Sequence, residues 1–315
     1  MLYSDNMPKI QSPLDIISFF KDYKLSSNSQ KYLKFHALRY FILWQRVLDV
    51  AANFNSPLVE SEADKILHCV QDDNSVVHDS KKEIRDDSLK PSEKILRFAQ
   101  SDISPTQIDT LLTKTNNLKI LDIGPGFFTE LLGQYFSEFE IHSLGLNSGY
   151  FEFKSKVIFH PFDLNQLFLN PESEAQMLSK LPKFDMICFC EVLEHLYTGP
   201  EKTLEFLSKT LKPNGVIFIQ TPNGVSLRHR ILMLMGRNPY PLLRPSPNEP
   251  GHYREYTLNE LNEFLKKADL KLKKASFHNY FNYSGSIKNK IYKFVTRFFP
   301  ASFRDGVMIE VSKND

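Results

Sequence analysis

The chain has 315 residues, of which 42% are hydrophobic, so it is long enough to bury one large core or two smaller ones. Its three cysteines are too few and too unevenly spaced for a disulfide framework, which fits a reducing compartment. The first residues lack the basic and apolar segments of a secretion signal, and no apolar run approaches the roughly 20 residues that cross a bilayer. We therefore expect a cytoplasmic globular protein without a transmembrane segment.

The charge is unevenly distributed along the chain. The formal net charge is only +2, yet residues 226–304 hold 15 Lys and Arg against 5 Asp and Glu. Such an excess favours an anionic partner for the last third of the chain, whether phosphate, a lipid head group or a nucleic acid. Solvated helix faces would produce the same composition.

Residues 14–54 show a helical pattern. The segments "LDIISFF" and "YLKFHALRYFILWQRVLDVAANF" place apolar residues three and four positions apart, as Leu38 and Ile42 illustrate. We assign residues 1–59 to an N-terminal helical cap.

Residues 60–105 differ from the segments on both sides. "KILHCVQDD" from Lys65 is echoed by "KILRFAQSD" from Lys94, and the residues between are polar and highly charged. Two copies are too few for a solenoid. The paired segments resemble peptides translated from repetitive DNA elements that invade bacterial genes, so we interpret the stretch as a low-order insertion that is dispensable for chemistry.

From Leu118 onward, short apolar runs alternate with helical segments. "LKILDIG", "KFDMICFC" and "VIFIQTPN" are near-continuous apolar strands, typical of a parallel sheet covered on both faces. "GPEKTLEFLSKTLKPNG" has Pro200 in its first turn and ends at a Pro-Asn-Gly stop, and "YTLNELNEFLKKADL" carries a capping box of Thr257 and Glu260. The alternation predicts the α/β class.

A glycine turn follows the first of these strands, in "ILDIGPGFFTE". Gly124 and Gly126 let the backbone approach a ligand, and a helix N-terminus follows them. A dinucleotide fits poorly, because Thr129 replaces the third glycine and Asp122 would face a pyrophosphate. A carboxylate at this position favours a ligand with a cationic amino group.

These residues resemble the first motif of the class I S-adenosylmethionine-dependent methyltransferases, Asp-x-Gly-x-Gly. The blocks "FDMICFCEVLEHL", "LEFLSKTLKPNGVIFIQTPN" and "HYREYTLNELNEFLKKADL" follow in the family's order. The resemblance implies a Rossmann-like, seven-stranded, mostly parallel sheet with helices on both faces. It places the methyltransferase domain at residues 106–315, with a cap loop over the acceptor at residues 225–250.

The resemblance also assigns cofactor contacts by position. Asp122, Gly124 and Gly126 would hold the methionine end of S-adenosylmethionine, and Asp163 would meet the adenine amino group. Asn147 stands where the family usually has an acidic residue on the ribose, which lowers the expected strength of that contact.

Two cysteines lie in the strand before the next motif. Cys188 and Cys190 alternate with Ile187 and Phe189, as on a buried strand. We expect Cys190, at the strand end, to contact the cofactor.

The motif "EVLEH" directly follows that strand and supplies Glu191, Glu194 and His195. In the small-RNA 2′-O-methyltransferases, and similarly in the ubiquinone-biosynthesis O-methyltransferases, such a motif joins a later histidine, here His252, to hold a divalent metal. Two carboxylates and two imidazoles would suit Mn²⁺, Fe²⁺, Co²⁺ or Zn²⁺ better than Mg²⁺. Two alternatives remain: His252, His195 or Glu191 acts as the base without metal, or the motif is only a helix start.

The acceptor is the least determined feature. "IKNKIYKFVTRFFP" is a basic amphipathic segment that either covers the sheet or contacts a membrane surface. The arrangement resembles methyltransferases of bacterial surface-glycan gene clusters, which implies a small-molecule, sugar or lipid-linked glycan hydroxyl. The alternatives are a metal-dependent RNA 2′-O-methyltransferase and a cofactor-binding protein that no longer catalyses.

Overall fold

The computed structural model describes residues 10–23, 25–53, 118–137, 139–146, 152–244, 251–280 and 287–314. The predicted insertion at residues 60–105 and the predicted ribose contact Asn147 lie outside these ranges.

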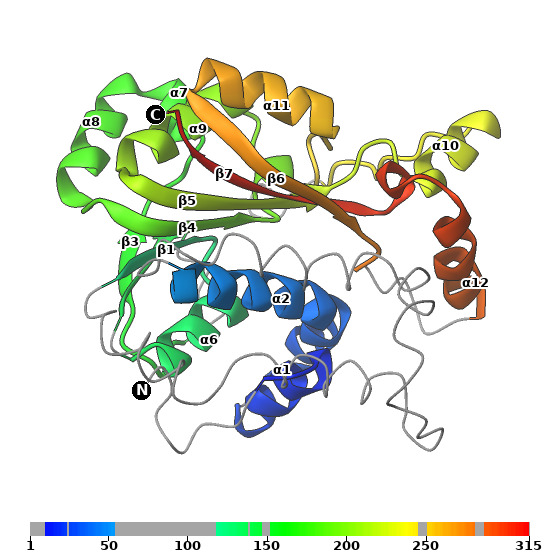
Figure 1. The fold of residues 1–315 in the computed structure, drawn as a ribbon, viewed down its shortest axis with the longest axis horizontal. Helices are drawn as coiled ribbons and strands as arrows, with labels where there is room; N and C mark the ends of the chain where they lie inside the picture. The colour runs from blue at the N-terminus through cyan, green and yellow to red at the C-terminus, as the bar shows by residue number, and fades with distance from the viewer. Residues whose placement is uncertain are drawn as a thin grey trace, which may run out of the picture.

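A seven-stranded sheet forms the centre of the molecule, in the order β3-β2-β1-β4-β5-β7-β6 (Figure 1). The strands are β1 (Lys119–Ile123), β2 (Glu140–Gly145), β3 (Ile158–Pro161), β4 (Phe184–Cys190), β5 (Leu211–Pro222), β6 (Leu270–His278) and β7 (Gly306–Lys313). β1 to β5 are parallel, whereas β7 runs antiparallel to both β5 and β6. The predicted Rossmann-like, mostly parallel sheet is confirmed. Strand order reverses between β1 and β4, where sheets of this kind bind ligands at the carboxyl ends of their strands.

Helices cover both faces of the sheet. They are α1 (Pro13–Phe19), α2 (Ser27–Asn53), α6 (Phe127–Tyr135), α7 (Gln166–Leu169), α8 (Pro171–Lys180), α9 (Pro200–Thr210), α10 (Leu227–Leu234), α11 (Leu258–Lys267) and α12 (Ile287–Val295). Short 3₁₀ turns are η1 (Phe20–Asp22), η2 (Leu193–His195), η3 (Thr296–Phe298) and η4 (Ala301–Phe303). α8, α9 and α11 lie on one side of the sheet and α1, α2 and α6 on the other (Figure 1). No helix in the described ranges is long and apolar enough to span a membrane.

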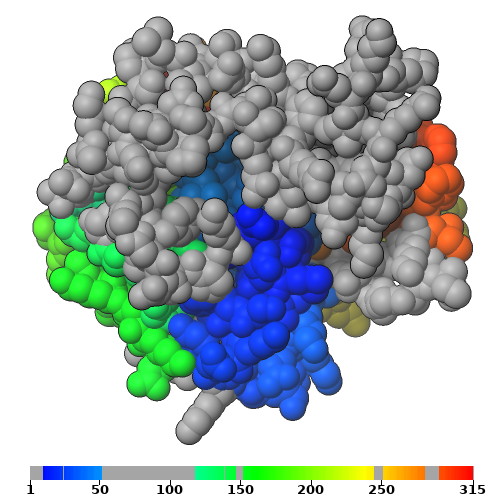
Figure 2. Space-filling view, turned by 60° about the horizontal axis from the view of Figure 1, so that its bottom comes forward, coloured from blue at the N-terminus to red at the C-terminus, as the bar shows by residue number. Residues whose placement is uncertain are grey.

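The N-terminal helices α1 and α2 pack with α6 against one face of the sheet, in one cluster of buried hydrophobic residues. Ser12 caps α1 by accepting a hydrogen bond from Asp15 N, with Pro13 at the first helical position. In α2, the ring centroid of Trp44 lies 5.0 Å from that of Tyr135 and 5.2 Å from that of Phe136, on the opposing α6 segment. The helical pattern predicted for residues 14–54 is confirmed. Figure 2 shows α1 and α2 reaching the surface on this face.

The predicted boundary between α9 and β5 differs from the observed one. α9 ends at Thr210 and β5 begins at Leu211, so the predicted Pro-Asn-Gly stop lies within the strand. A Cβ at Gly215 would lie 2.6 Å from Leu211 Cδ1 and 3.0 Å from the carbonyl oxygen of Phe184. The absence of a side chain at Gly215 therefore lets β5 approach β4 there. The capping box of α11 is confirmed, with Thr257 Oγ1 accepting from Glu260 N and the Glu260 carboxylate accepting from Thr257 N.

Candidate active site

The glycine turn after β1 adopts a conformation that only glycine accommodates readily. Gly124 has φ +88°, and a Cβ there would lie 3.0 Å from Val192 Cγ2. Its N–H donates to the carbonyl of Leu144 at 2.9 Å, which fixes the turn to the end of β2. Because Val192 follows Glu191 directly, the turn and the "EVLEH" motif lie against each other.

Asp122 is buried at the end of β1, beside this turn. Thr129 Oγ1 donates to Asp122 Oδ2 at 2.5 Å, so the residue that replaces the third glycine orients the carboxylate. Burial raises the pKa of Asp122 to about 7, although the Thr129 hydrogen bond and the nearby Arg39 guanidinium oppose the rise. A cation placed beside this carboxylate would restore its ionised form.

Two other predicted cofactor contacts, Asp163 and Cys190, have partners within the protein. Asp163 Oδ1 accepts from the backbone N–H of Asn165 at 2.9 Å and from its side-chain amide at 3.0 Å, as a turn-capping aspartate does. Cys190 Sγ lies 3.8 Å from the carbonyl of Phe218 on the neighbouring strand, and burial raises the pKa of its thiol.

The "EVLEH" segment does not form an α-helix. Glu191 has φ +57°, in the left-handed region, and the chain then enters the short turn η2. The side chains of Glu191, Glu194 and His195 therefore do not share one α-helical face. The group of residues that could hold a metal comprises Glu194, His195 and His252 and does not include Glu191, whose place among the metal ligands stays a prediction.

Glu194, His195 and His252 form a compact cluster. Each offers one potential ligand atom, and these three atoms lie within 4.8 Å of one another. Glu194 is fully buried, with Oε2 accepting from Thr221 Oγ1 at 3.0 Å. Its other oxygen, Oε1, has no hydrogen-bond partner among the described residues and lies 4.0 Å from His195 Nε2.

In each histidine of the cluster, a hydrogen bond at Nδ1 orients the ring. His195 Nδ1 lies 2.9 Å from the carbonyl oxygen of Gly251, and His252 Nδ1 lies 2.9 Å from Glu255 Oε1. Because both partners are acceptors, each neutral ring carries its proton on Nδ1 and keeps a lone pair on Nε2. The buried Glu194 oxygen without a partner and the two Nε2 atoms fit a divalent cation. Histidines that bind metals usually donate their other ring N–H to a carbonyl or carboxylate, as these two do.

Glu191 instead belongs to a second, neighbouring group. Arg39 of α2 is 4% exposed, and its Nη1 lies 3.4 Å from Glu191 Oε2. Tyr280, just after β6, places its hydroxyl 3.1 Å from Glu191 Oε1 and 3.3 Å from the carbonyl of Thr221. Neither Arg39 nor Tyr280 was among the site residues predicted from the sequence. Arg39 could have been noticed, because it precedes the buried Leu43 by four residues and so shares its helix face.

Burial shifts the pKa values of the site's carboxyl groups and of His195 in opposite directions. Burial raises the pKa of Glu191 to about 8, with the neighbouring Glu194 adding to the rise and Arg39 opposing it. Burial raises the pKa of Glu194 to about 7. Burial lowers the pKa of His195, and His252 lowers it further. At neutral pH, His195 is therefore an unprotonated imidazole, whereas Glu191 holds its proton much of the time.

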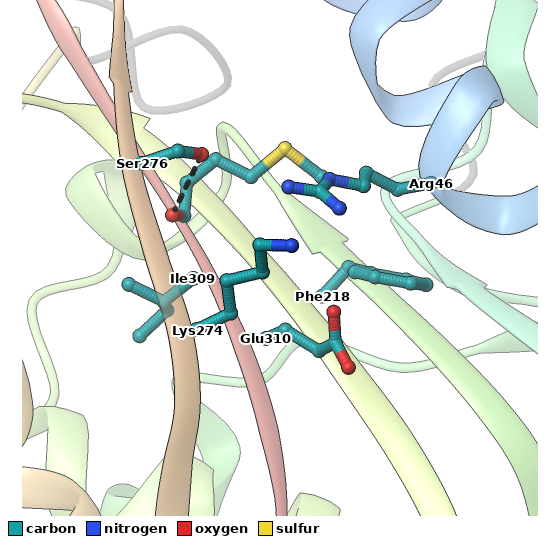
Figure 3. A pocket seen from close by; sticks show the side chains of 7 residues that line it. Arg46, Phe218, Lys274, Ser276, Ile309 and Glu310 are labelled. Atoms are coloured by element: carbon teal, nitrogen blue, oxygen red, sulfur yellow. Dashed lines mark hydrogen bonds between the residues drawn. The ribbon is translucent and has the colours of Figure 1, made fainter. Parts of the chain in front are cut away.

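Two recesses lie along α2, and only one of them touches this site. The recess in Figure 3, of about 10 Å³, is lined by Arg46, Phe218, Lys274 and Glu310 among others, and has room for about one water molecule. It contains no predicted site residue.

The second recess is a cleft of about 180 Å³. Its walls are apolar residues of α1 and α2, together with Lys34, Tyr280 and Lys293. Tyr280 lines this cleft and also donates a hydrogen bond to Glu191, which follows β4.

Comparison with known proteins gives the following similarities. Residues 85–275 match a family model described as a methyltransferase domain. The mitochondrial ubiquinone biosynthesis O-methyltransferase of Dictyostelium discoideum is 33% identical over 103 residues, which are 33% of this chain and 26% of that protein. The matched segment thus spans about a quarter of that relative.

Solved structures of S-adenosylmethionine-dependent methyltransferases are also similar. That from Clostridium acetobutylicum is 15% identical with a TM-score of 0.40, covering 71% of this chain and 96% of its own. That from Archaeoglobus fulgidus is 18% identical with a TM-score of 0.40, covering 66% and 92%. Because the family model matches more than half of the residues, the chain belongs to the methyltransferase-domain family, in agreement with its resemblance to the class I S-adenosylmethionine-dependent enzymes.

Proposed function

We propose that the protein transfers the methyl group of S-adenosylmethionine to a hydroxyl oxygen of a small molecule, a sugar or a lipid-linked glycan. The observation that carries this proposal is the cluster of Glu194, His195 and His252 beside the glycine turn. It offers two imidazole nitrogens that can accept a proton next to the turn where the methyl donor would bind.

In this proposal Asp122 pairs with the cationic amino group of the donor, and Gly124 and Gly126 let the backbone approach it. Asp163, Asn147 and Cys190 stay proposed contacts to the rest of the cofactor. The buried position of Asp122 favours a cationic ligand, because a positive charge there would offset the unfavourable ionisation of the carboxyl group.

The transfer itself is an in-line displacement. When bound, S-adenosylmethionine would supply the methyl group, which would bond to the acceptor oxygen as its bond to sulfur breaks and S-adenosylhomocysteine is left. The hydroxyl proton passes to Nε2 of His195 or His252, each held by its Nδ1 partner. Glu191 is the weaker candidate base, because at neutral pH its raised pKa keeps it largely protonated.

A divalent metal fits the same residues. Glu194, His195 and His252 would hold it, and it would supply a positive charge that lowers the pKa of the acceptor hydroxyl. This fit favours a second candidate, a metal-dependent RNA 2′-O-methyltransferase. The same donor set favours Mn²⁺ over Mg²⁺, because two of its atoms are imidazole nitrogens.

The cleft between α1, α2 and Tyr280 supports a small amphipathic acceptor over RNA. Its apolar walls suit a hydrophobic body, and Lys34 and Lys293 suit an anionic group on the same molecule. A cleft of about 180 Å³ holds only part of a large acceptor, so a lipid-linked substrate would extend out of it.

Two measurements test the proposal. The first follows formation of S-adenosylhomocysteine over a panel of phenols, sugars, lipid-linked glycans and RNA oligonucleotides. We expect turnover with an amphipathic hydroxyl compound, and His195→Ala should lower kcat by roughly 10²–10⁴-fold. Binding of S-adenosylhomocysteine without turnover on any acceptor would favour the catalytically silent alternative, and turnover only on RNA would favour the second candidate.

The second measurement titrates Mn²⁺ calorimetrically into protein loaded with S-adenosylhomocysteine. We expect Glu194→Ala to abolish the heat of binding, while the control Glu263→Ala, an exposed glutamate of α11, leaves it unchanged. Absence of binding to the unsubstituted protein would leave the two histidines as proton acceptors without a metal.

A further inference from the structure

Exposed apolar side chains concentrate in two segments that the proposed chemistry does not use. Of the 20 large hydrophobic residues exposed within the described ranges, 12 lie in residues 227–244 and 287–304. Leu234 is 88% exposed, Leu242 90% and Phe298 72%. The others are Ile231, Met233, Met235, Tyr240, Leu243, Ile291, Phe294, Val295 and Phe299. Clusters of this kind mark interaction surfaces, whereas isolated exposed hydrophobic residues do not.

All charged residues of the same two segments are basic. Residues 227–244 and 287–304 contain nine Lys and Arg and no Asp or Glu. In α12, the sequence "IKNKIYKFV" interleaves lysines with Ile291 and Phe294. The combination of apolar and cationic side chains is typical of helices that lie in the interface of an anionic membrane.

The two segments contact each other, and we call their exposed side chains together the α10–α12 surface. The backbone N–H of Arg228 in α10 donates to the hydroxyl of Tyr292 in α12 at 3.3 Å. The guanidinium carbon of Arg230 lies 4.4 Å from the ring centroid of Phe303 in η4. Figure 1 shows α10 and α12 at the same end of the molecule, away from α8 and β3.

The composition of this surface distinguishes between occupants. A symmetric contact with a second copy would bring two sets of cationic side chains against each other, which is unfavourable. Single-stranded RNA would use the cations and the aromatic rings, yet the most exposed residues, Leu234 and Leu242, are aliphatic and stack poorly on bases. A bilayer with anionic head groups satisfies both the aliphatic and the basic side chains.

We propose that the α10–α12 surface docks the protein on an anionic phospholipid membrane. Its apolar side chains enter the boundary between head groups and acyl chains, and its lysines and arginines contact the phosphates. The surface begins close to the candidate active site, because His229 of α10 lies 3.6 Å from Glu255, which orients His252. Docking would bring a membrane-borne acceptor toward the cluster, but the docking itself does not depend on the proposed methyl transfer.

Sedimentation with vesicles tests the docking. One set contains phosphatidylcholine alone, and the other contains phosphatidylcholine with one quarter phosphatidylglycerol. We expect the full chain to sediment with the anionic vesicles and to be released by high salt. The double variant Leu234→Glu/Phe298→Glu should weaken this binding at least about tenfold, since it removes two apolar anchors and adds two repelled charges.

A matched control separates this surface from exposed hydrophobicity in general. Phe168→Glu/Leu169→Glu on α7 changes residues that are 68% and 55% exposed at a different site, and it should leave vesicle binding unchanged. Thermal denaturation would establish that both double variants fold. Equal binding to neutral vesicles, no sedimentation with anionic vesicles, or an equal loss in the control would each overturn the proposal.

The rival occupants have distinct signatures. Concentration-dependent self-association that Leu234→Glu/Phe298→Glu abolishes, without any vesicle binding, would assign the surface to a second copy of the chain. Tight, salt-sensitive binding of an RNA oligonucleotide in place of the vesicles would assign it to nucleic acid.

Discussion

Helices α2 and α12 share a pattern of apolar and basic residues but differ in how much of their apolar face is buried. Both alternate aromatic or aliphatic residues with lysine and arginine at helical spacing. α2 buries Leu33, Trp44 and Val47 against α6 and the sheet, whereas α12 leaves Ile291 and Phe294 more than half exposed. A helical hydrophobic pattern therefore predicts the helix and its apolar face, but not what covers that face.

Substitutions in the apolar faces of the two helices should differ most in their effect on stability. Trp44→Ala removes a fully buried side chain and should lower the free energy of unfolding by about 3–5 kcal/mol. Phe294→Ala, at a residue 58% exposed, should change it by no more than about 0.5 kcal/mol. Chemical denaturation of the two variants measures both values.

A large loss for Phe294→Ala would mean that α12 is covered in solution. That result would contradict the contrast between the helices, and it would also remove Phe294 from the α10–α12 surface available to a membrane.

A similar contrast separates the features that could be predicted from the sequence from those that could not. The strands, the glycine turn and the capping box of α11 depend on residues close together in the chain, so local patterns located them. The contacts of Glu191 do not, because Tyr280 lies 89 residues away and Arg39 comes from α2. The left-handed conformation of Glu191 could not be predicted either, since glycine is the residue that usually marks such a position.

Arginines of α2 and of the α10–α12 surface should differ as well, with an intermediate effect on stability. Arg39→Met keeps the volume of the side chain but leaves Glu191 without its buried cation. Removing one partner of a buried pair is strongly destabilising, but Glu191 can become neutral by binding a proton, so we expect a loss of roughly 1–3 kcal/mol. Arg237→Met, at an exposed residue after α10, should have almost no effect.

The double variant Arg39→Met/Glu191→Gln tests the cause of this loss. Glutamine carries no charge, so the double variant should recover most of the stability that Arg39→Met loses. If the double variant is no more stable than Arg39→Met, the loss comes from packing around α2 and not from an unpaired carboxylate.

The smallest expected effect is the contribution of Glu191 to the pH dependence of the free energy of unfolding. Its folded-state pKa of about 8 exceeds its ordinary value of 4.5, so the folded protein holds a proton that the unfolded chain loses between these values. Stability from this group is therefore present at low pH and falls as the pH rises toward 8, by up to about 1.4 kcal/mol per pH unit. Because Glu191→Gln cannot titrate, unfolding measured at pH 6 and pH 7 should show the unsubstituted protein losing about 1 kcal/mol relative to the variant.

Other buried groups also titrate, so the comparison with Glu191→Gln is essential. His278 has a pKa lowered to about 4 by burial, which weakens the folded state as the pH falls below the ordinary histidine value, in the opposite direction. That contribution is common to both proteins and cancels in their difference. Parallel pH profiles for the two proteins would mean that Glu191 is ionised in the folded state, and that the Arg39 pair outweighs the cost of burying its charge. Glu191 would then carry a full negative charge beside the Glu194 cluster, and it would again be a candidate proton acceptor.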